Sequence, residues 1–379
     1  MQIYAFDWAE KKALTVYDAQ TKKVKEVANT IEAFEKFLAK LKTPATLLFE
    51  QGGGDTFKIM AYRAGHVVGL VDPKKVKVYR DAQGIAKSDA NDARAIYDYF
   101  INQGGGATTA LSERIMPQMP PAKAKKGGGA GRTMSKRIVC DLPAPFSIFT
   151  EADAEMAEIK ILYREHEKIK VSMVREKNKL RAFALKFEIA RVAGDAVGKI
   201  RKEAKIEIAS KEKRLALLKK ELAKKVEPFP VWTHYKDVKG IGPTIVAGLI
   251  GELGAREFSR GGLKHYSGMV KKYTKKIGHY HSVNNPDGGH ASKNNHIKAV
   301  LFQFADCIIK HRTPKWRPLY DSMKKYYAKK HKDWRPGKVD AHAKKFIETK
   351  FLEEFYCNLR GGAKSILSTR IGNIMPAPL

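Results

Sequence analysis

Two short apolar runs near the N-terminus each end at a carboxylate, and this pattern constrains the fold more than any other feature of the sequence. Residues 1–6 alternate in character and lead to Asp7, and residues 45–49 form a second β-like run that ends at Glu50. A carboxylate that closes a buried strand is costly unless a positive charge compensates it. We therefore expect the folded N-terminal domain to bring both carboxylates to one point, where a cation compensates them.

Two further carboxylates, Asp89 and Asp92, lie near the start of a predicted helix at residues 89–100. Residues three apart share a helix face, so both side chains can point the same way. Each acidic residue alone could be an ordinary surface residue, and Asp89 could simply cap the helix. Together the four provide the oxygen ligands that hard divalent cations prefer, and we expect them to hold one or two Mg²⁺ ions, with Mn²⁺ as a substitute. Two such ions can activate water and stabilise the leaving oxygen of a phosphodiester, so the set predicts a catalytic site for metal-dependent cleavage of nucleic acid.

The basic residues indicate the substrate class. The chain has 72 Lys and Arg against 40 Asp and Glu, a formal net charge of +32. Residues 1–100 hold 16 basic and 13 acidic residues, so almost the whole excess lies in the remaining 279 residues. A polycation of this kind is typical of proteins that bind phosphate backbones, because each neutralised phosphate releases counterions.

An acidic membrane surface is the alternative partner, and the sequence disfavours it. No apolar stretch approaches the roughly 18 residues of a membrane span. The first apolar run is interrupted by Asp7, which is unlike a signal peptide. The three cysteines, Cys140, Cys307 and Cys357, are widely spaced and odd in number, which fits a reducing compartment and excludes a zinc ribbon. We therefore expect a cytoplasmic protein that does not bind membranes.

The first hundred residues alternate between strand-like and helix-like segments. The patterns predict strands at residues 3–8, 13–18, 45–50 and 66–71, helices at 31–41, 55–64 and 89–100, and a third hairpin strand within 21–29. Residues 73–80 fit either a basic loop or a short helix near the proposed site. This order is typical of a ribonuclease-H-like α/β domain, in which helices cover both faces of a mixed sheet.

The composition changes completely at residues 103–136. Glycine, proline and lysine dominate this segment, which cannot pack a core and is typical of a flexible linker. Residues 151–227 then contain almost no Gly or Pro, and their apolar spacing predicts two long antiparallel helices with a break near residues 192–194. The expected organisation is the first part of a nuclease domain at 1–102, a flexible insertion and return to that domain at 103–150, a helical coiled-coil region at 151–228 and a C-terminal nucleic-acid-binding domain at 229–379.

A glycine-rich turn at residues 240–244, Gly-Ile-Gly-Pro-Thr, precedes an apolar helix. Backbone N–H groups at such a helix start favour a phosphate, although turns of this type also serve simple packing. We expect the turn and a set of basic and amide side chains to contact nucleic acid: Lys74, Lys75, Lys77, Arg80, Lys87, Gly240, Gly242, Thr244, Lys271, Lys272, Lys275, Lys276, Lys293, Asn294, Asn295 and Lys298.

Residues 87–93, Lys-Ser-Asp-Ala-Asn-Asp-Ala, resemble the K-[TS]-D-x-x-D-A signature of the DEDD transposases of insertion sequences, which are bridge-RNA-guided recombinases. Residues 240–254, 266–270, 292–298 and 336–341 resemble further segments of that family. The resemblance implies a RuvC-like domain that carries the four carboxylates, a coiled-coil spacer and a mainly helical, transposase-like C-terminal domain.

One departure from that family concerns the nucleophile. Those recombinases carry a nucleophilic serine shortly after the segment that residues 266–270 match, and here the interval 271–278 contains no serine. Ser267, Ser282 and Ser292 are the local candidates. The chain also resembles the Tas nucleases of TIGR systems, which join a RuvC-like nuclease to a Nop-like RNA-binding domain and need no such serine.

The resemblance to the Tas nucleases implies an RNA-guided, Mg²⁺-dependent DNA endonuclease whose partners are a guide RNA and double-stranded DNA, and we also expect a homodimer. A bridge-RNA-guided recombinase and a guide-independent junction resolvase are the alternatives, because the same carboxylates would serve a resolvase and a recombinase would add a serine. A non-enzymatic RNA-binding protein would not need the carboxylates at all.

Overall fold

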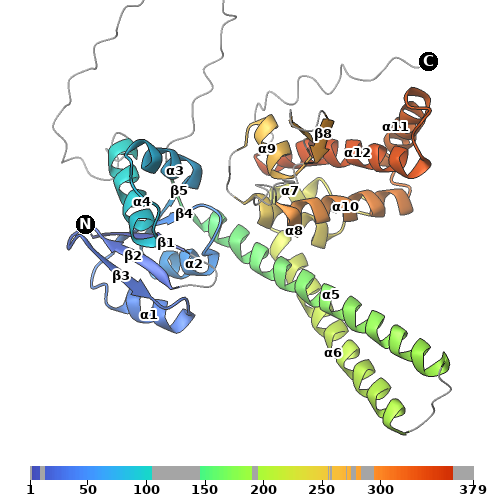
Figure 1. Ribbon diagram of the computed structural model, residues 1–379, viewed down its shortest axis with the longest axis horizontal. Coiled ribbons are helices and arrows are strands. Elements are labelled where there is room, and N and C mark those ends of the chain that lie inside the picture. The colour runs from blue at the N-terminus through green and yellow to red at the C-terminus, as the bar shows by residue number, and fades with distance from the viewer. Residues whose placement is uncertain are drawn as a thin grey trace, which may run out of the picture. The chain divides into compact units, whose positions relative to one another are not determined.

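The alternating apolar segments near the N-terminus form five strands of a six-stranded mixed sheet, and the long helical patterns that follow form a second unit (Figure 1). The structure, a computed structural model, describes residues 2–8, 13–104, 146–189, 195–254, 256, 258–269, 271–274, 279–282 and 294–361. The chain divides into unit 1, Met1–Ala154, and unit 2, Glu155–Leu379. The predicted combination of a mixed α/β part and a mostly helical remainder is confirmed.

The strand order in the sheet of unit 1 is β3-β2-β1-β4-β5-β6. The strands are β1 (Ile3–Asp7), β2 (Leu14–Asp18), β3 (Lys23–Val27), β4 (Thr46–Glu50), β5 (Val67–Val71) and β6 (Phe146–Ile148). Strands β1, β4 and β5 are parallel, whereas β2, β3 and β6 run antiparallel to their neighbours. The predicted hairpin and its third strand are therefore confirmed. Strand β6 has no counterpart in the sequence predictions, and it brings the chain back to β5 after the segment 105–145, which lies outside the described residues.

The helices of unit 1 cover the two faces of this sheet. They are α1 (Ile31–Ala39), α2 (Asp55–Arg63), α3 (Pro73–Ala82) and α4 (Asp89–Gly104), so the basic segment 73–80 is a helix. On one face Phe6 of β1 stacks on Phe49 of β4, with 4.6 Å between ring centroids, and both rings contact Phe34 of α1. On the opposite face Ala5 and Leu48 are buried in a cluster with residues of α3 and α4. Side chains alternate along a strand, so residues that follow Ala5 and Leu48 by two positions lie on the α4 face.

The turn after β4 depends on glycine. Gly54, at the start of α2, has a left-handed backbone with φ of 67°, which glycine adopts without steric cost. A Cβ atom on Gly53 would lie 2.3 Å from the indole ring of Trp8, so only glycine lets this ring pack on the backbone. Because Trp8 follows Asp7 and this turn follows Glu50, the contact holds the ends of β1 and β4 together.

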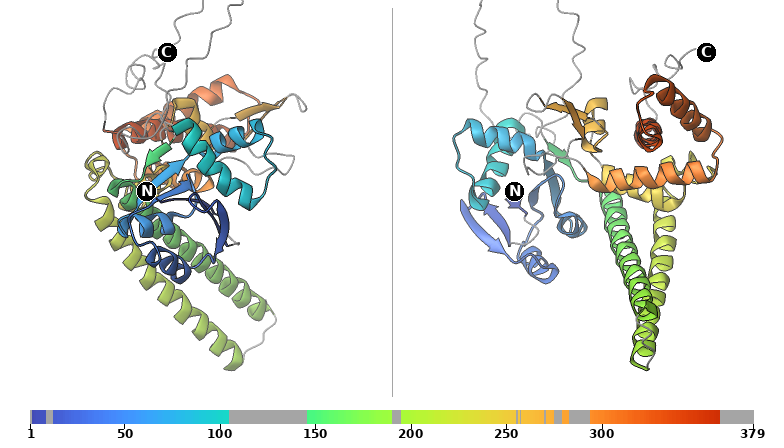
Figure 2. Two further views of the ribbon diagram at one scale, coloured as in Figure 1. Left: turned by 90° about the vertical axis from the view of Figure 1, so that its left-hand side faces the viewer. Right: turned by 45° about the vertical axis from the view of Figure 1, so that its right-hand side comes forward.

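Unit 2 is built on two long helices, α5 (Glu151–Ile189), which begins in unit 1, and α6 (Asp195–Val226). Ion pairs between them join Glu158 to Lys225 and Glu165 to Arg214, which is an antiparallel pairing. The two helices run side by side in both views of Figure 2. The predicted antiparallel pair is confirmed, and its predicted break lies outside the described residues.

The remaining elements of unit 2 form a helical core. They are α7 (Pro230–Thr233), α8 (Pro243–Leu253), α9 (Arg260–Tyr266), β7 (Lys271–Thr274), β8 (His279–Ser282), α10 (Asn295–Lys310), α11 (Trp316–Lys330) and α12 (Pro336–Leu359). Every residue of α8 from Ile245 to Leu253 is buried, so this helix is surrounded by its neighbours. Phe304 of α10 stacks on Phe351 of α12 with 3.7 Å between centroids. None of the described helices is long and apolar enough to span a membrane.

Candidate active site

The first two predicted carboxylates lie side by side at the carboxyl ends of neighbouring parallel strands. Strands β1 and β4 pair in a register that sets Phe6 opposite Phe49, so Asp7 and Glu50 are the next residues along each strand. Asp7 follows Ala5 by two positions and Glu50 follows Leu48 by two, so strand alternation directs both carboxylates to the face covered by α4. The sequence pattern, in which each strand-like run ends at a carboxylate, predicted that Asp7 and Glu50 lie close together.

Helix α4 brings Asp92 to the same region, whereas Asp89 lies at its exposed first turn. The Ser88 hydroxyl accepts a hydrogen bond from the Asn91 backbone N–H at 3.1 Å, so Ser88 makes the capping contact that Asp89 could have made. Asp92 is 17% exposed and pairs with the guanidinium of Arg80 in α3. Asp89 is exposed.

The carboxyl group of Glu50 is the most perturbed group of this site. Its pKa is raised from 4.5 to about 7, first because the group is buried and then because the negative charges of Asp7 and Asp92 oppose its ionisation. The positive charges of Lys58 and Arg80 act in the opposite direction but do not compensate. At the half-buried Glu50, burial and the two neighbouring negative charges thus outweigh the two positive charges.

Lys58 is a site residue that the sequence analysis missed. Its side chain in α2 is only 2% exposed, its amino group lies 3.7 Å from the Asp55 carboxylate, and its charge reaches Glu50. No sequence pattern marks it, because a lysine between Phe57 and Ile59 on a short helix is ordinarily a surface residue.

The donor chemistry of this site fits a hard divalent cation. Asp7, Glu50 and Asp92 offer only oxygen ligands, and the raised pKa of Glu50 shows that a positive charge would be stabilised among them. Within the described residues no three His, Cys, Asp or Glu side chains are gathered closely enough to form a metal-binding group. Asp92 is engaged in its ion pair with Arg80.

The basic residues expected around this site lie mostly on α3. Lys74, Lys77 and Lys87 are exposed and Lys75 is half-buried. Arg80 differs from them, since its side chain is 11% exposed and is directed to the carboxylates.

The residues of unit 2 expected to contact nucleic acid fall into three groups. Gly240, Gly242 and Thr244 line a cavity at the start of α8. Asn295 and Lys298 are exposed in the first turn of α10. Of the rest, Lys271 and Lys272 lie in β7, Lys275, Lys276 and Lys293 lie outside the described residues, and Asn294 caps α10.

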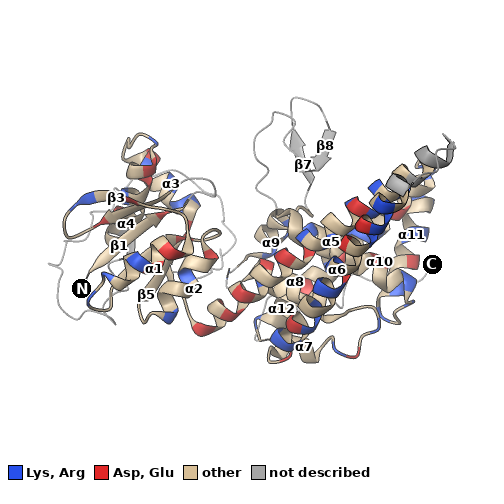
Figure 3. Cartoon of the chain, turned by 90° about the horizontal axis from the view of Figure 1, so that it is seen from below, with Lys and Arg blue, Asp and Glu red and all other residues tan. Residues whose placement is uncertain are grey.

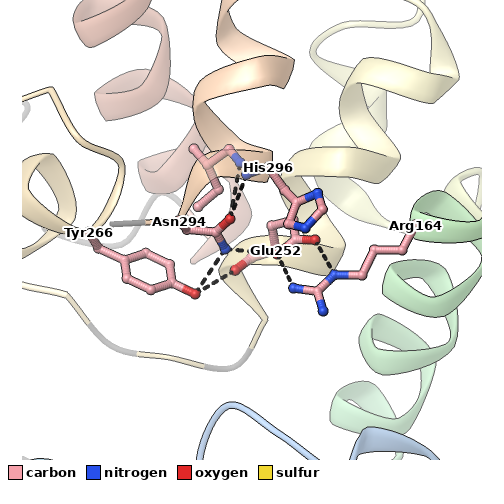
Figure 4. A network of polar contacts seen from close by, with 6 residues as sticks. Arg164, Glu252, Tyr266, Asn294 and His296 are labelled. Carbon is pink, nitrogen blue, oxygen red and sulfur yellow. Dashed lines mark hydrogen bonds and ion pairs between the residues drawn. The ribbon is translucent and has the colours of Figure 1, made fainter. Parts of the chain in front are cut away.

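Asn294 has a structural task in a buried polar network, drawn in Figure 4. Its side-chain oxygen accepts the N–H groups of His296 and Ile297 at the start of α10, and its amide donates to Glu252 at 2.8 Å. The Glu252 carboxylate also accepts two hydrogen bonds from the Arg164 guanidinium, at 2.8 and 3.0 Å. Burial alone would raise the pKa of Glu252, but the hydrogen bonds and charge of Arg164 lower it. The ionised Glu252 therefore ties α5, α8 and α10 together.

The three candidate serines differ in what the structure shows. Ser267 is completely buried, and its hydroxyl donates to the Lys264 carbonyl oxygen at 3.1 Å. Ser282 lies in β8, and Ser292 lies outside the described residues. A buried hydroxyl without access to a phosphate cannot act as a nucleophile.

Lys and Arg are distributed along both long helices with Asp and Glu between them (Figure 3). Several of these charges pair across the helices, as Lys177 does with Glu212 at 2.7 Å.

Comparison with models of protein families finds no match to this chain, and no curated protein is similar to it.

Proposed function

We propose that the chain is an RNA-guided, Mg²⁺-dependent DNA endonuclease. Its proposed catalytic site, formed by Asp7, Glu50, Asp89 and Asp92, cleaves the phosphodiester bonds of DNA. The observation that carries this proposal is the half-buried Glu50, whose pKa is raised to about 7 first by its burial and then by the like charges of Asp7 and Asp92. Asp92 is paired with Arg80, and Glu50 nevertheless meets the like charges of Asp7 and Asp92 at the end of β4. Such a convergence of like charges is typical of sites that act on or through a cation.

The fold of unit 1 supports the same proposal. A β1–β2–β3 antiparallel meander followed by parallel β4 and β5, in the order β3-β2-β1-β4-β5, is the arrangement expected of a ribonuclease-H-like domain of RuvC type. In open sheets with parallel strands, ligands bind beyond the carboxyl ends of those strands. Asp7 and Glu50 occupy that position.

The chemistry assigns separate tasks to the side chains. A Mg²⁺ ion held by Asp7, Glu50 and Asp92 would stabilise negative charge on the phosphate and lower the pKa of a water molecule. With the cation bound, its positive charge would keep the Glu50 carboxylate ionised, so Glu50 would act as an oxygen ligand. Arg80 would be available to bind a phosphate oxygen if the cation replaced it beside Asp92.

Guide RNA and double-stranded DNA are the proposed partners, and the charge of the chain supports this. The net charge of +32 lies almost entirely outside the first hundred residues, so a neutral catalytic unit is joined to a basic part that suits phosphate backbones. The same proposal includes a Nop-like, RNA-binding role for unit 2. It also includes assembly of the chain as a homodimer. Recombination through a serine is the weaker alternative, because Ser267 is buried and bonded to its own helix.

The experiment that tests this function starts with the RNA that co-purifies with the protein. Its sequence defines a complementary DNA duplex, and the protein–RNA complex should cut that duplex with Mg²⁺ but not with EDTA. A scrambled duplex is the control. Equal cutting of both duplexes would refute RNA guidance, and no cutting of either would refute the nuclease.

A further inference from the structure

A strongly basic surface lies where α11 ends and α12 begins (Figure 1). Residues 324–338, which we call the basic tip, contain seven Lys or Arg and a single acidic residue, Asp333. All seven basic side chains are exposed: Lys324, Lys325, Lys329, Lys330, Lys332, Arg335 and Lys338. The sequence analysis singled out none of them as a contact to nucleic acid.

The cations of the basic tip have no carboxylate partners. Nearer the start of α11, Lys315 pairs with Glu354 and Arg317 pairs with Asp321. None of the seven cations of the tip forms such an ion pair within the described residues. Like charges at this density repel one another and destabilise a helix unless an anion lies over them. The uncompensated charge therefore indicates a partner that carries several negative charges.

Stacked aromatic rings hold the backbone of the tip in place. The His331 ring stacks on Trp334 with 3.9 Å between centroids, and Trp334 also contacts His342 of α12 at 4.4 Å. Lys338 lies over the Trp334 ring, 4.3 Å from its centroid. The turn between the two helices is thus packed against α12. Its cations therefore project from an ordered backbone, which lowers the entropy cost of binding.

Tyr326 adds an aromatic surface to this basic tip. It is the only large apolar side chain exposed within residues 324–338, at 42%. Lys330 lies 5.4 Å from its ring centroid and donates to its hydroxyl at 3.1 Å. Lys329 follows Tyr326 by three positions and shares its helix face. A flat ring among cations suits a single-stranded nucleic acid, because the ring stacks on a base while the cations neutralise phosphates.

Other polyanions would use only part of this surface. A duplex keeps its bases stacked on one another, so it offers no base to Tyr326. A helix that binds a membrane surface buries a whole apolar face in the lipid, whereas Tyr326 is alone among cations. An unpaired strand engages both the ring and the charges.

We propose that the basic tip binds an unpaired segment of RNA, with one base stacked on Tyr326 and phosphates held by the surrounding Lys and Arg side chains. This assigns an RNA-binding surface to one part of unit 2. The identification of the RNA as the guide rests on the proposed function, whereas the binding surface itself does not.

The test measures binding of the full chain to a fluorescent oligouridine, and to the same strand annealed to oligoadenosine, over a range of salt concentrations. The tip variant carries Lys325→Gln, Lys329→Gln and Lys332→Gln, which remove three exposed cations. We expect it to bind oligouridine at least about tenfold more weakly. The slope of log affinity against log salt should become shallower by about 2, because each phosphate contact to a single strand contributes about 0.7.

The matched control removes the same charge from another part of unit 2. It carries Lys202→Gln, Lys205→Gln and Lys213→Gln, three exposed lysines of α6. Since exposed charges act over only about a Debye length, this variant should bind oligouridine within about twofold of wild type. An equal loss of affinity in the tip and control variants would overturn the site.

Tyr326→Leu tests the stacking contact separately from charge. It should weaken binding of oligouridine about tenfold and leave binding of the duplex unchanged, because only an unpaired base can stack on the ring. The duplex also reports that the variant is folded. Equal effects on the two probes, or wild-type binding of both, would overturn the assignment to an unpaired strand.

The RNA that co-purifies with each protein identifies the source of the strand. The tip variant should retain less of this RNA than the control variant. A wild-type amount in the tip variant would overturn the assignment to the guide. No cleavage is measured, so a failure here leaves the carboxylate site untouched, and an inactive carboxylate site would leave the binding of oligouridine as predicted.

Discussion

The guanidinium of Arg80 in α3 pairs with the carboxylate of Asp92 in α4, beside the ends of β1 and β4. The Nε atom of the same guanidinium is buried without a hydrogen-bond partner. Arg80 therefore provides positive charge to the site of Asp7, Glu50 and Asp92, although its Nε–H donates no hydrogen bond there. A divalent cation would take over this task and release the arginine.

Replacing Arg80 should make unit 1 dependent on a cation. In Arg80→Met the charges of Asp7, Glu50 and Asp92 lose an opposing charge, so the variant should exchange amide hydrogens in β1 and β4 faster than wild type without Mg²⁺. Added Mg²⁺ should restore protection by a larger factor than in wild type, since ligand binding stabilises the state that binds it. Lys77→Met, on the exposed side of α3, should behave as wild type. Identical protection of the Arg80 variant in both buffers would contradict this interpretation.

The half-buried Glu50 should make the free energy of unfolding fall as pH rises. Its pKa is 4.5 ordinarily and about 7 in the fold, so the folded chain holds a proton that the unfolded chain releases. This contribution is complete below pH 4.5 and is lost as pH rises through about 7. Glu50→Gln should therefore gain stability over wild type across this interval, by at most about 3 kcal/mol.

Amide hydrogen exchange of β4 at several pH values measures this difference, with the exposed Glu35→Gln as control. A difference between Glu50→Gln and wild type that does not change with pH would show that Glu50 is not buried among like charges.

How far the sequence predicts this site depends on whether a residue is positioned by its own strand or by the packing of helices from elsewhere in the chain. Asp7 and Glu50 could be predicted together, because each ends its own strand and neighbouring parallel strands end at one edge. The positions of Arg80 and Lys58 could not, since they depend on which helix covers which face. Strand β6 has only three residues, too few for a periodic pattern. The cavity at the start of α8 is lined by residues of four helices, which no local pattern encodes.

The network around Glu252 should be important for the stability of unit 2. Glu252→Gln leaves Arg164 and Asn294 with a weaker partner at a fully buried position, and we expect a loss of about 3 kcal/mol in the free energy of unfolding. Arg214→Met breaks the exposed pair with Glu165 and should cost less than about 1 kcal/mol. Urea unfolding followed by circular dichroism gives both values, and equal losses would show that burial does not govern these pairs.

Serines should be dispensable for DNA cleavage. In a hydrolytic site water is the nucleophile, so Ser267→Ala, Ser282→Ala and Ser292→Ala should each retain activity within about tenfold, roughly 1.4 kcal/mol of barrier. The measurement combines cleavage rates with a search for covalent protein–DNA adducts on denaturing gels. An adduct that one of these changes removes would establish the recombinase instead.

The central claim is that Asp7, at the end of β1, is part of a metal-dependent catalytic site. Cleavage of DNA complementary to the co-purified RNA tests it most directly, with Asp7→Asn compared with Asp98→Asn, a carboxylate of α4 that pairs with Arg94 instead. We predict that Asp7→Asn lowers the rate at least about a thousandfold, roughly 4 kcal/mol of barrier, while RNA binding and the Asp98 variant remain as wild type. Cleavage by Asp7→Asn at the wild-type rate would contradict the account.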